Sequence, residues 1–266
     1  MFGNVPRVPE QPVRLDHDGP LAIITIDSPP LNLFDEALVA ALGYAVASVA
    51  GSDARGLLLR AEGRAVSAGV DVNVFADLTP EAAALLWRKW FEMIHALEDL
   101  PIPTVFAAHG LCLTAAFEVS LACDLLLAAE SARFGLVEIV VGLTPSMGGP
   151  QRLAERAGPA RARELVYTGE LYGAATLERW NVVNRVLPDE GFADAAREFA
   201  LQLASGPTRA HAATKAIIRE QIEVGTGGAD EITPEISGRL FATEDLRNAV
   251  ASFLRDGPGK ATYTGR

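Results

Sequence analysis

The sequence predicts an α/β layer architecture that ends in a helical C-terminal region. Two short apolar runs, Leu21–Ile26 (LAIITI) and Gly56–Arg60 (GLLLR), have the length and composition of buried strands. A helical pattern separates them, and strands that alternate with helices are typical of a layered α/β fold. After about Ser205 the pattern changes, because only helical periodicity follows.

Three further strands are expected before the helical region. They are Thr104–Ala108, Asp124–Ala128 and Val182–Val186. Each is a short apolar run next to a turn or a helical pattern, as in a sheet whose strands are joined by helices.

The capping residues indicate where helices begin. Asp35 can cap a helix that runs to about Ala50, and Thr79 followed by Pro80 combines a hydroxyl cap with proline at the first helical position. The helix after Thr79 is expected to reach about Asp99. A shorter helix is expected over Ala115–Cys123.

The C-terminal region is expected to be helical and free of strands. Its predicted helices are Thr208–Val224, Pro234–Leu240 and Glu244–Leu254. The glycine-rich stretch Gly225–Asp230 (GTGGAD) is expected to be a flexible loop, and no strand precedes it, so it does not indicate a dinucleotide site. We therefore expect a core domain over residues 1–205 and a helical region over residues 206–266.

Composition and charge exclude several classes of protein. Of the 266 residues, 49% are hydrophobic and 21% are charged, which is typical of a globular protein and not of a disordered one. The net charge of −11 argues against nucleic acid or an anionic membrane as a partner, although an anionic cofactor needs only a local site. No apolar run reaches the roughly 18 residues of a membrane span.

The N-terminus and the cysteines add two further expectations. Met1–Pro12 contains no basic flank followed by an apolar stretch, so we expect no secretion signal and a cytoplasmic protein. Cys112 and Cys123 have no CxxC spacing, which favours buried, inert thiols over a disulfide or a zinc site. Trp87 is most simply a packing residue, and His109 most simply a structural one.

Two glutamates lie in apolar surroundings. Glu138 interrupts the run Leu136–Val141 (LVEIVV), where an extended chain would place it on an apolar face and burial would raise its pKa. Glu118 lies on the predicted helix at Ala115–Cys123 with no cationic neighbour one turn away. The alternatives are a solvated turn for Glu138 and an interaction with the helix dipole for Glu118. Paired carboxylates of this kind are candidates for a general acid and a general base.

A third feature follows the predicted strand at Gly56–Arg60. The segment Ala65–Asp71 (AVSAGVD) has the pattern of a junction between a strand and a turn. Backbone N–H groups at such a junction can point at an oxygen atom of a ligand. The alternative is an ordinary turn.

Together these segments resemble the crotonase superfamily, the enoyl-CoA hydratase/isomerase family, over roughly Leu21 to Lys260. The resemblance rests on the order and spacing of three stretches: Ala65–Asp71 (AVSAGVD), Pro101–Leu125 (PIPTVFAAHGLCLTAAFEVSLACDL) and Phe134–Leu153 (FGLVEIVVGLTPSMGGPQRL). Shorter matches are Leu165–Gly169 (LVYTG) and Trp180–Pro188 (WNVVNRVLP).

The resemblance implies a fold and an assembly. The fold is the crotonase (ClpP-like) spiral of two perpendicular β-sheets wrapped by helices, with a C-terminal helical region used for trimerisation. A homotrimer or a dimer of trimers is therefore expected. Acyl-CoA is the implied substrate, so coenzyme A arrives with the substrate, and no permanently bound cofactor and no metal are expected.

The resemblance also implies the site residues. The thioester oxygen would be held by the backbone N–H groups of Val70 and Ala115. Coenzyme A would contact Ala68, Val70 and Asp71, with Lys260 near its phosphates. The two catalytic glutamates fall on Glu118 and Glu138, and the presence of both favours hydration of 2-enoyl-CoA.

Some residues depart from the family pattern and give this chain its own features. The glycine-rich turn before the first glutamate is Thr114-Ala115-Ala116, and Ser146 replaces a usual glycine after the second. We expect Thr114, Ala116 and Ser146 to line the acyl pocket. Two alternatives to a hydratase stay open: a Δ3,Δ2-enoyl-CoA isomerase that uses one glutamate, and an acyl-CoA-binding protein with little turnover.

Overall fold

The computed structural model describes residues 11–266. The expectation that Met1–Pro12 carries no secretion signal lies almost wholly outside these residues. None of the helices within residues 11–266 is long and apolar enough to cross a bilayer.

A six-stranded sheet forms the centre of the fold. Its strand order is β1-β2-β3-β4-β6-β9, with β1 antiparallel to β2 and the remaining neighbours parallel. The strands are β1 (Val13–Asp18), β2 (Leu21–Ile26), β3 (Gly56–Ala61), β4 (Thr104–Ala108), β6 (Leu125–Ala129) and β9 (Arg185–Leu187). Every residue of β2 and β4 is buried, as expected for parallel strands covered on both faces.

A second, three-stranded sheet adjoins the first. It consists of β5 (Leu111–Leu113), β7 (Arg133–Gly135) and β8 (Tyr172–Gly173), in the order β5-β7-β8. The sequence did not predict the strands of this sheet because two or three residues are too few to show a pattern. It did not predict β1 because polar residues interrupt its apolar pattern (VRLDHD). The Thr114 N–H donates to the Gly135 carbonyl at 2.9 Å, so this sheet fixes the point where α3 begins.

The predicted helix caps are confirmed in the first half of the chain. Asp35 accepts a hydrogen bond from the Leu38 N–H at the start of α1 (Glu36–Ala50). Thr79 accepts from the Ala82 N–H at the start of α2 (Pro80–Glu98). The third predicted helix is α3 (Ala115–Ala122), and all eight of its residues are buried.

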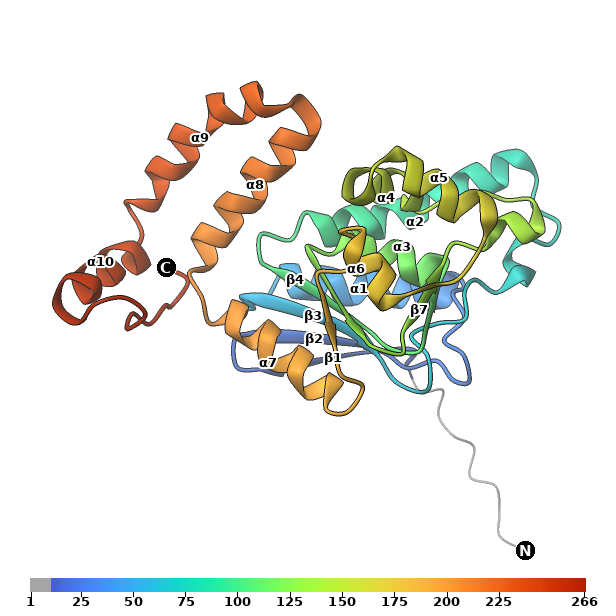
Figure 1. Cartoon of the computed structure of the whole chain (residues 1–266), viewed down its shortest axis with the longest axis horizontal. Coiled ribbons are helices and arrows are strands. Elements are labelled where there is room, and N and C mark those ends of the chain that lie inside the picture. The colour runs from blue at the N-terminus through green and yellow to red at the C-terminus, as the bar shows by residue number, and fades with distance from the viewer. Residues whose placement is uncertain (1–10) are drawn as a thin grey trace, which may run out of the picture.

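The helices that complete the core follow the small sheet. They are the 3₁₀ helices η1 (Val72–Phe75) and η2 (Glu138–Val141) and the α-helices α4 (Gly149–Ala157), α5 (Pro159–Thr168), α6 (Ala174–Arg179) and α7 (Phe192–Ala204). Helix α7 packs on β2, β3 and β4, while α1 packs on β1 and β2. These layers are visible in Figure 1, where α2 to α5 gather above the sheet.

Several expectations about local structure differ from the observed fold. The run Leu136–Val141 is not extended, because Glu138–Val141 forms η2, which ends at Gly142 with a φ of 75°. The last strand of the large sheet begins at Arg185, so the predicted strand Val182–Val186 starts too early. Val182 and Val183 are buried by packing outside the sheet, and the apolar pattern alone cannot distinguish that from a strand.

The predicted loop Gly225–Asp230 is also mostly helical. Gly225, with a φ of 91°, makes the turn alone, and α9 (Thr226–Leu240) begins at the next residue. Helix α9 packs against α8 (Thr208–Val224), so tertiary contacts stabilise a helix that its glycines and Pro234 disfavour locally.

The C-terminal arm, defined here as helices α8, α9 and α10 (Glu244–Asp256), projects away from the core. Figure 1 shows α8 and α9 as an antiparallel pair beside the main body. The predicted boundary at residue 205 falls between the end of α7 and the start of α8. Several large apolar side chains of the arm face solvent: Ile218, Ile222, Val224, Phe241, Val250, Phe253 and Leu254.

Candidate active site

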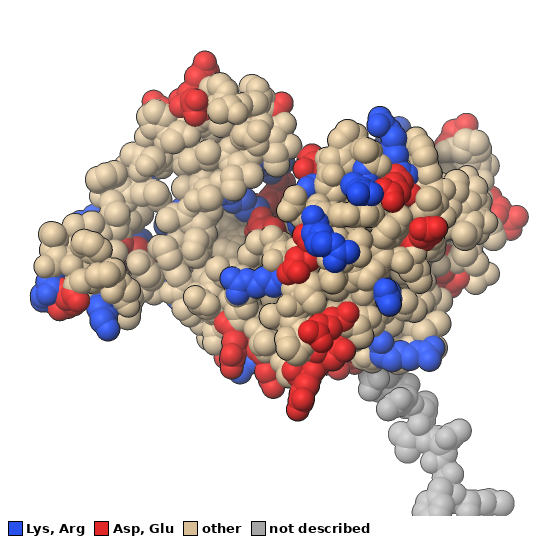
Figure 2. All heavy atoms as spheres, viewed as in Figure 1, with Lys and Arg blue, Asp and Glu red and all other residues tan. Residues whose placement is uncertain are grey.

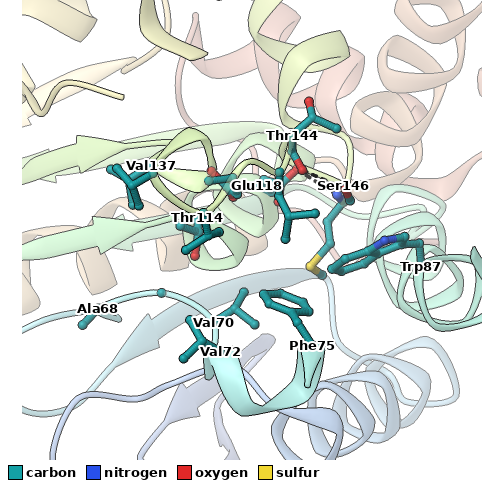
Figure 3. A pocket seen from close by; sticks show the side chains of 16 residues that line it. Ala68, Val70, Val72, Phe75, Trp87, Thr114, Glu118, Val137, Thr144 and Ser146 are labelled. Carbon is teal, nitrogen blue, oxygen red and sulfur yellow. Dashed lines mark hydrogen bonds between the residues drawn. The ribbon is translucent and has the colours of Figure 1, made fainter. Parts of the chain in front are cut away.

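A cavity of about 150 Å³ lies between the start of α3, the segment before η1, and the segment from η2 to α4. Figure 3 shows Thr114 and Glu118 on one side of it and Ala68, Val70 and Val72 on the other. Phe75 and Trp87 close one end, with ring centroids 5.7 Å apart. The cavity therefore combines apolar walls with a few polar groups, as small-molecule sites usually do.

Asn32 holds the segment that contains Val70. The buried Asn32 side chain donates through Nδ2 to the carbonyls of Glu62, Ala65 and Val66 at 3.0 to 3.2 Å. Its own Oδ1 accepts from the Ser28 N–H at 2.7 Å. One amide side chain thus fixes the turn after β3.

The same segment is tied to the strand that leads into α3. The Ser67 N–H donates to the Leu111 carbonyl at 3.0 Å, and the Leu113 N–H donates to the Ser67 carbonyl at 3.2 Å. Because these bonds join the two segments, the backbones of Val70 and Ala115 are held in a fixed relation to each other.

The N–H groups of Val70 and Ala115 have no hydrogen-bond acceptor within residues 11–266. Ala115 is the first residue of α3, where N–H groups point out of the helix end and carry the positive end of its dipole. Val70 forms an isolated parallel bridge with Phe34, but the hydrogen bonds of this bridge are made by its neighbours: Phe34 donates to the Gly69 carbonyl, and Asp71 donates to the Phe34 carbonyl. Val70 lines the cavity, whereas Ala115 is fully buried and follows the lining residue Thr114 in the chain. Two unused donors on these joined segments can bind a ligand oxygen that develops negative charge.

Glu118 is held firmly inside the cavity. Its Oε1 accepts hydrogen bonds from the N–H groups of Met147 and Gly149, both at 2.8 Å. A Cβ atom added to Gly149 would lie 3.0 Å from Cγ and Oε1 of Glu118, so glycine is needed there for this close approach. Burial raises the pKa of Glu118 to about 7, against the opposing effect of these backbone hydrogen bonds.

Glu138 lies at the first position of η2 and lines the same cavity. Its Oε2 is buried and has no hydrogen-bond partner among the described residues. Burial, and next the charge of Glu118, raise the pKa of Glu138 to about 8. Two carboxyl groups therefore share one cavity and titrate near neutral pH, so one can hold a proton while the other is ionised.

These pKa values predict a pH dependence of folding stability. The folded protein keeps protons on the two carboxyl groups that the unfolded chain releases above its ordinary value of 4.5. The stability contribution is therefore complete below about pH 4.5 and is lost as the pH rises toward 7 and 8.

We therefore expect Glu138→Gln to raise Tm relative to the unmodified protein at pH 9, with little difference at pH 4.5. Thermal unfolding followed by circular dichroism at the two pH values measures this. The exposed Glu92 provides the control, since Glu92→Gln should show no such pH dependence. A Tm at pH 9 that is lower for Glu138→Gln than for the unmodified protein would contradict the conclusion that burial of the ionised Glu138 carboxylate destabilises the fold.

The structure gathers most of the predicted site residues around the cavity. Ala68, Val70, Thr114, Glu118, Glu138 and Ser146 line it, and the Ser146 hydroxyl donates to the Thr144 carbonyl at 2.8 Å. Ala115 and Ala116 are not among the lining residues, and both are fully buried within α3.

Asp71 and Lys260 lie outside the cavity wall. The Asp71 side chain caps η1 by accepting from the Asn73 N–H at 3.0 Å. Lys260 is exposed and follows α10 at the end of the C-terminal arm. Their predicted contacts with coenzyme A stay predictions.

Sequence reasoning missed three residues that shape the site. Asn32 carries no local signal other than a polar residue after Pro29-Pro30-Leu31, because its partners are about 30 residues away in the chain. Phe75 and Trp87 wall the cavity, although Trp87 was interpreted only as a packing residue. An aromatic residue that packs in the core and one that lines a pocket have the same local sequence pattern, so only the fold distinguishes the two roles.

Side chains that could ligate a metal do not gather within residues 11–266. No cluster of three or more His, Cys, Asp or Glu side chains with metal-binding geometry occurs within the described residues. Cys112 and Cys123 are both buried and unpaired, and burial raises the pKa of both thiols.

Comparisons with known proteins agree with this fold. The family model described as "Enoyl-CoA hydratase/isomerase" matches residues 16–263. A probable enoyl-CoA hydratase of Mycobacterium tuberculosis is 29% identical over 91% of this chain and 94% of its own. The carnitinyl-CoA dehydratase of Salmonella enteritidis is 34% identical over 80% of this chain and 82% of its own.

A solved structure gives the same result for the fold. The crystal structure of an enoyl-CoA hydratase from Bacillus anthracis superposes with a TM-score of 0.89 at 26% identity and covers 96% of this chain and 100% of that chain. The layered core, the C-terminal arm and the cavity with its two carboxyl groups thus occur in a chain that belongs to the enoyl-CoA hydratase/isomerase family, with the crotonase fold.

Proposed function

We propose that the protein is a lyase that hydrates 2-enoyl-CoA thioesters to 3-hydroxyacyl-CoA. The observation that carries the proposal is that two carboxyl groups, on Glu118 and Glu138, line one cavity together with Val70, whose backbone N–H is unused. The second unused N–H, that of Ala115, directly follows the lining residue Thr114 in the chain. The names of the relatives, which include enoyl-CoA hydratases and a CoA-thioester dehydratase, support the same chemistry.

The proposed reaction adds the elements of water across a carbon–carbon double bond. The thioester oxygen accepts hydrogen bonds from the N–H groups of Val70 and Ala115, which stabilise the negative charge that develops there. The oxygen of water bonds to C3 as its proton leaves to one carboxylate, and C2 receives a proton from the other carboxyl group. No net change of oxidation state occurs, and no metal is required.

The surroundings of the two glutamates suggest their roles. Glu118 accepts two backbone hydrogen bonds, and such bonds stabilise the ionised form, so we assign it to the activation of water. Glu138 has the higher pKa, about 8, and its buried Oε2 has no partner, so we assign it to the protonation of C2. The reverse reaction exchanges these roles.

Coenzyme A is proposed to enter as part of the substrate and to leave with the product. The backbone of Ala68 and Val70 is the proposed contact for the adenine end, next to the proposed oxyanion site. The cavity, of about 150 Å³, has room for a short acyl group.

The decisive experiment is incubation with a panel of 2-enoyl-CoA and 3-enoyl-CoA esters of increasing chain length. A hydratase removes the absorbance of the conjugated thioester from 2-enoyl esters. An isomerase instead generates that absorbance from 3-enoyl esters. Binding of the esters without either change would indicate an acyl-CoA-binding protein with little turnover.

The exposed apolar side chains of the C-terminal arm support a proposed homotrimer or dimer of trimers. Helix α8 and helix α10 expose Ile218, Ile222, Phe253 and Leu254, and burial of such side chains is favourable by roughly 1.5 to 3 kcal/mol each. Figure 2 shows wide uncharged areas on the visible face of this arm.

We expect light scattering at micromolar concentration to give a trimeric or hexameric mass. The double variant Phe253→Asp/Leu254→Asp should shift the mass toward that of the monomer, because it puts charge on the exposed apolar face. Asn248→Asp adds the same group at an exposed polar position of α10 and should leave the mass unchanged. A monomeric mass for the unmodified protein would refute the assembly.

A further inference from the structure

Thr114 has a backbone conformation that favours glycine. Its φ is 47° and its ψ is −121°, and a β-branched side chain is strained in that region. The position is the residue before Ala115, in the turn that leads from β5 into α3. Threonine at this position therefore carries a local energetic cost that glycine would avoid.

The Thr114 side chain adds a second cost. Thr114 is only 6% exposed, and its Oγ1 has no hydrogen-bond partner among residues 11–266. It does not cap α3, since no N–H of the helix donates to it. A buried hydroxyl without a partner destabilises the folded protein, which makes a ligand the natural source of a partner.

The hydroxyl lies between the two segments that hold the unused backbone donors. Oγ1 lies 3.0 Å from the position that a Cβ atom on Gly69 would occupy, and Gly69 precedes Val70. Thr114 itself precedes Ala115. In Figure 3 the Thr114 oxygen faces the gap toward Ala68 and Val70.

We propose that the Thr114 hydroxyl donates a third hydrogen bond to the thioester oxygen, beside the N–H groups of Val70 and Ala115. The proposal rests on the proposed binding of an acyl-CoA thioester. The thioester oxygen is the acceptor that such a ligand brings between the two segments, and it becomes a stronger acceptor as the enolate develops. A hydrogen bond to it satisfies the hydroxyl and acts most strongly in the transition state.

Three substitutions separate the hydroxyl from the shape of the side chain. Thr114→Ser keeps the hydroxyl, Thr114→Val keeps the branched shape without it, and Thr114→Gly removes both the hydroxyl and the backbone strain. With the 2-enoyl-CoA that turns over fastest, we expect kcat of the serine variant within about 3-fold of the unmodified protein, and a loss of at least about 10-fold in the valine and glycine variants. KM should change less than kcat in all three.

The melting temperature distinguishes the proposed role of Thr114 from a structural role, because the two roles predict opposite changes in Tm. Thr114→Gly should have a Tm equal to or above that of the unmodified protein, because glycine relieves the strained φ. A residue kept for stability would instead lose Tm together with activity. Equal kcat for the valine variant and the unmodified protein would overturn the proposal and reduce the side chain to a space-filling role.

Acetoacetyl-CoA gives a test that does not require turnover. Its short acyl group suits the cavity, and its enolate form has its own absorbance, so a pH titration of the bound ligand reports how strongly the site stabilises an oxyanion. We expect the apparent pKa of the bound ligand to be lowest in the unmodified protein and the serine variant, and higher by about one unit, a 10-fold change, in the valine and glycine variants.

The two proposals fail in different ways. If no enoyl-CoA is hydrated but bound acetoacetyl-CoA shows the expected order of pKa values, the hydratase function fails and the role of Thr114 stands. If hydration is normal and the titration is the same in all four proteins, the role of Thr114 fails alone. If acetoacetyl-CoA does not bind to the unmodified protein at all, the proposed role of Thr114 is overturned as well.

Discussion

Glu118→Gln and Glu138→Gln are each expected to lower kcat for hydration by about 10² to 10⁴, because each carboxyl group is assigned a proton transfer that an amide cannot perform. Glutamine suits both positions in size. At position 118 its Oε1 can still accept from the Met147 and Gly149 N–H groups, so the turn before α4 should survive. The loss should therefore appear in kcat while the folded state persists.

The measurement is steady-state hydration of a 2-enoyl-CoA, with circular dichroism to verify folding. Glu92→Gln on α2 is the matched control, because Glu92 is exposed and lies outside the cavity wall. The double variant should be little worse than either single one if the two groups act on the same water and substrate. Isomerisation that only Glu138→Gln abolishes, with no hydration by the unmodified protein, would move the assignment to the isomerase.

Removal of the Ala115 N–H is expected to lower kcat by about 10² to 10³, which is the usual cost of losing one oxyanion donor. Ala115→Pro removes this donor at the first position of α3, where proline is tolerated in helices. The φ of Ala115 is not in the left-handed region, unlike that of Thr114, so its methyl group creates no strain. Ala115→Gly keeps the N–H and should retain most of the activity.

The turn before Ala115 makes a second variant necessary. Proline constrains the residue before it, and Thr114 already has an unusual conformation, so Ala115→Pro could fail for lack of folding. Replacement of Ala115 by lactic acid, which exchanges the amide for an ester, removes the N–H and keeps the methyl group. Full activity in the folded ester variant would exclude Ala115 from the oxyanion site.

Local signals in the sequence predicted much of the core. Asp35 and Thr79 cap their helices through bonds that span three residues, and α8 has the predicted ends Thr208 and Val224. Glu118 and Glu138 could be selected because a charge among apolar neighbours is visible in the sequence itself. That both line one cavity required the family resemblance, since 20 residues and two strands separate them.

What could not be predicted depends on contacts between distant residues. Helix α9 forms in spite of its glycines because it packs against α8. Asn32 acts through hydrogen bonds to carbonyl groups about 30 residues away in the chain. The short strands of the small sheet contain two or three residues each, too few to show an alternating pattern. The unpaired Thr114 hydroxyl was likewise invisible, because the absence of a partner is a property of the whole fold.

The contact between Gly149 and Glu118 restricts the order in which this site can change during evolution. A methyl group on Gly149 would lie 3.0 Å from Cγ and Oε1 of Glu118 and 2.9 Å from Cδ1 of Leu136. A side chain at position 149 is therefore harmful while the glutamate is present, and a smaller residue at position 118 removes the contacts with Glu118 and leaves only the one with the flexible end of Leu136. A lineage that changes both positions must lose the Glu118 carboxylate before it gains a side chain at position 149. If glutamate later returned to position 118 alone, it would clash with that side chain. The two positions form an epistatic pair that makes the loss of this carboxylate difficult to reverse.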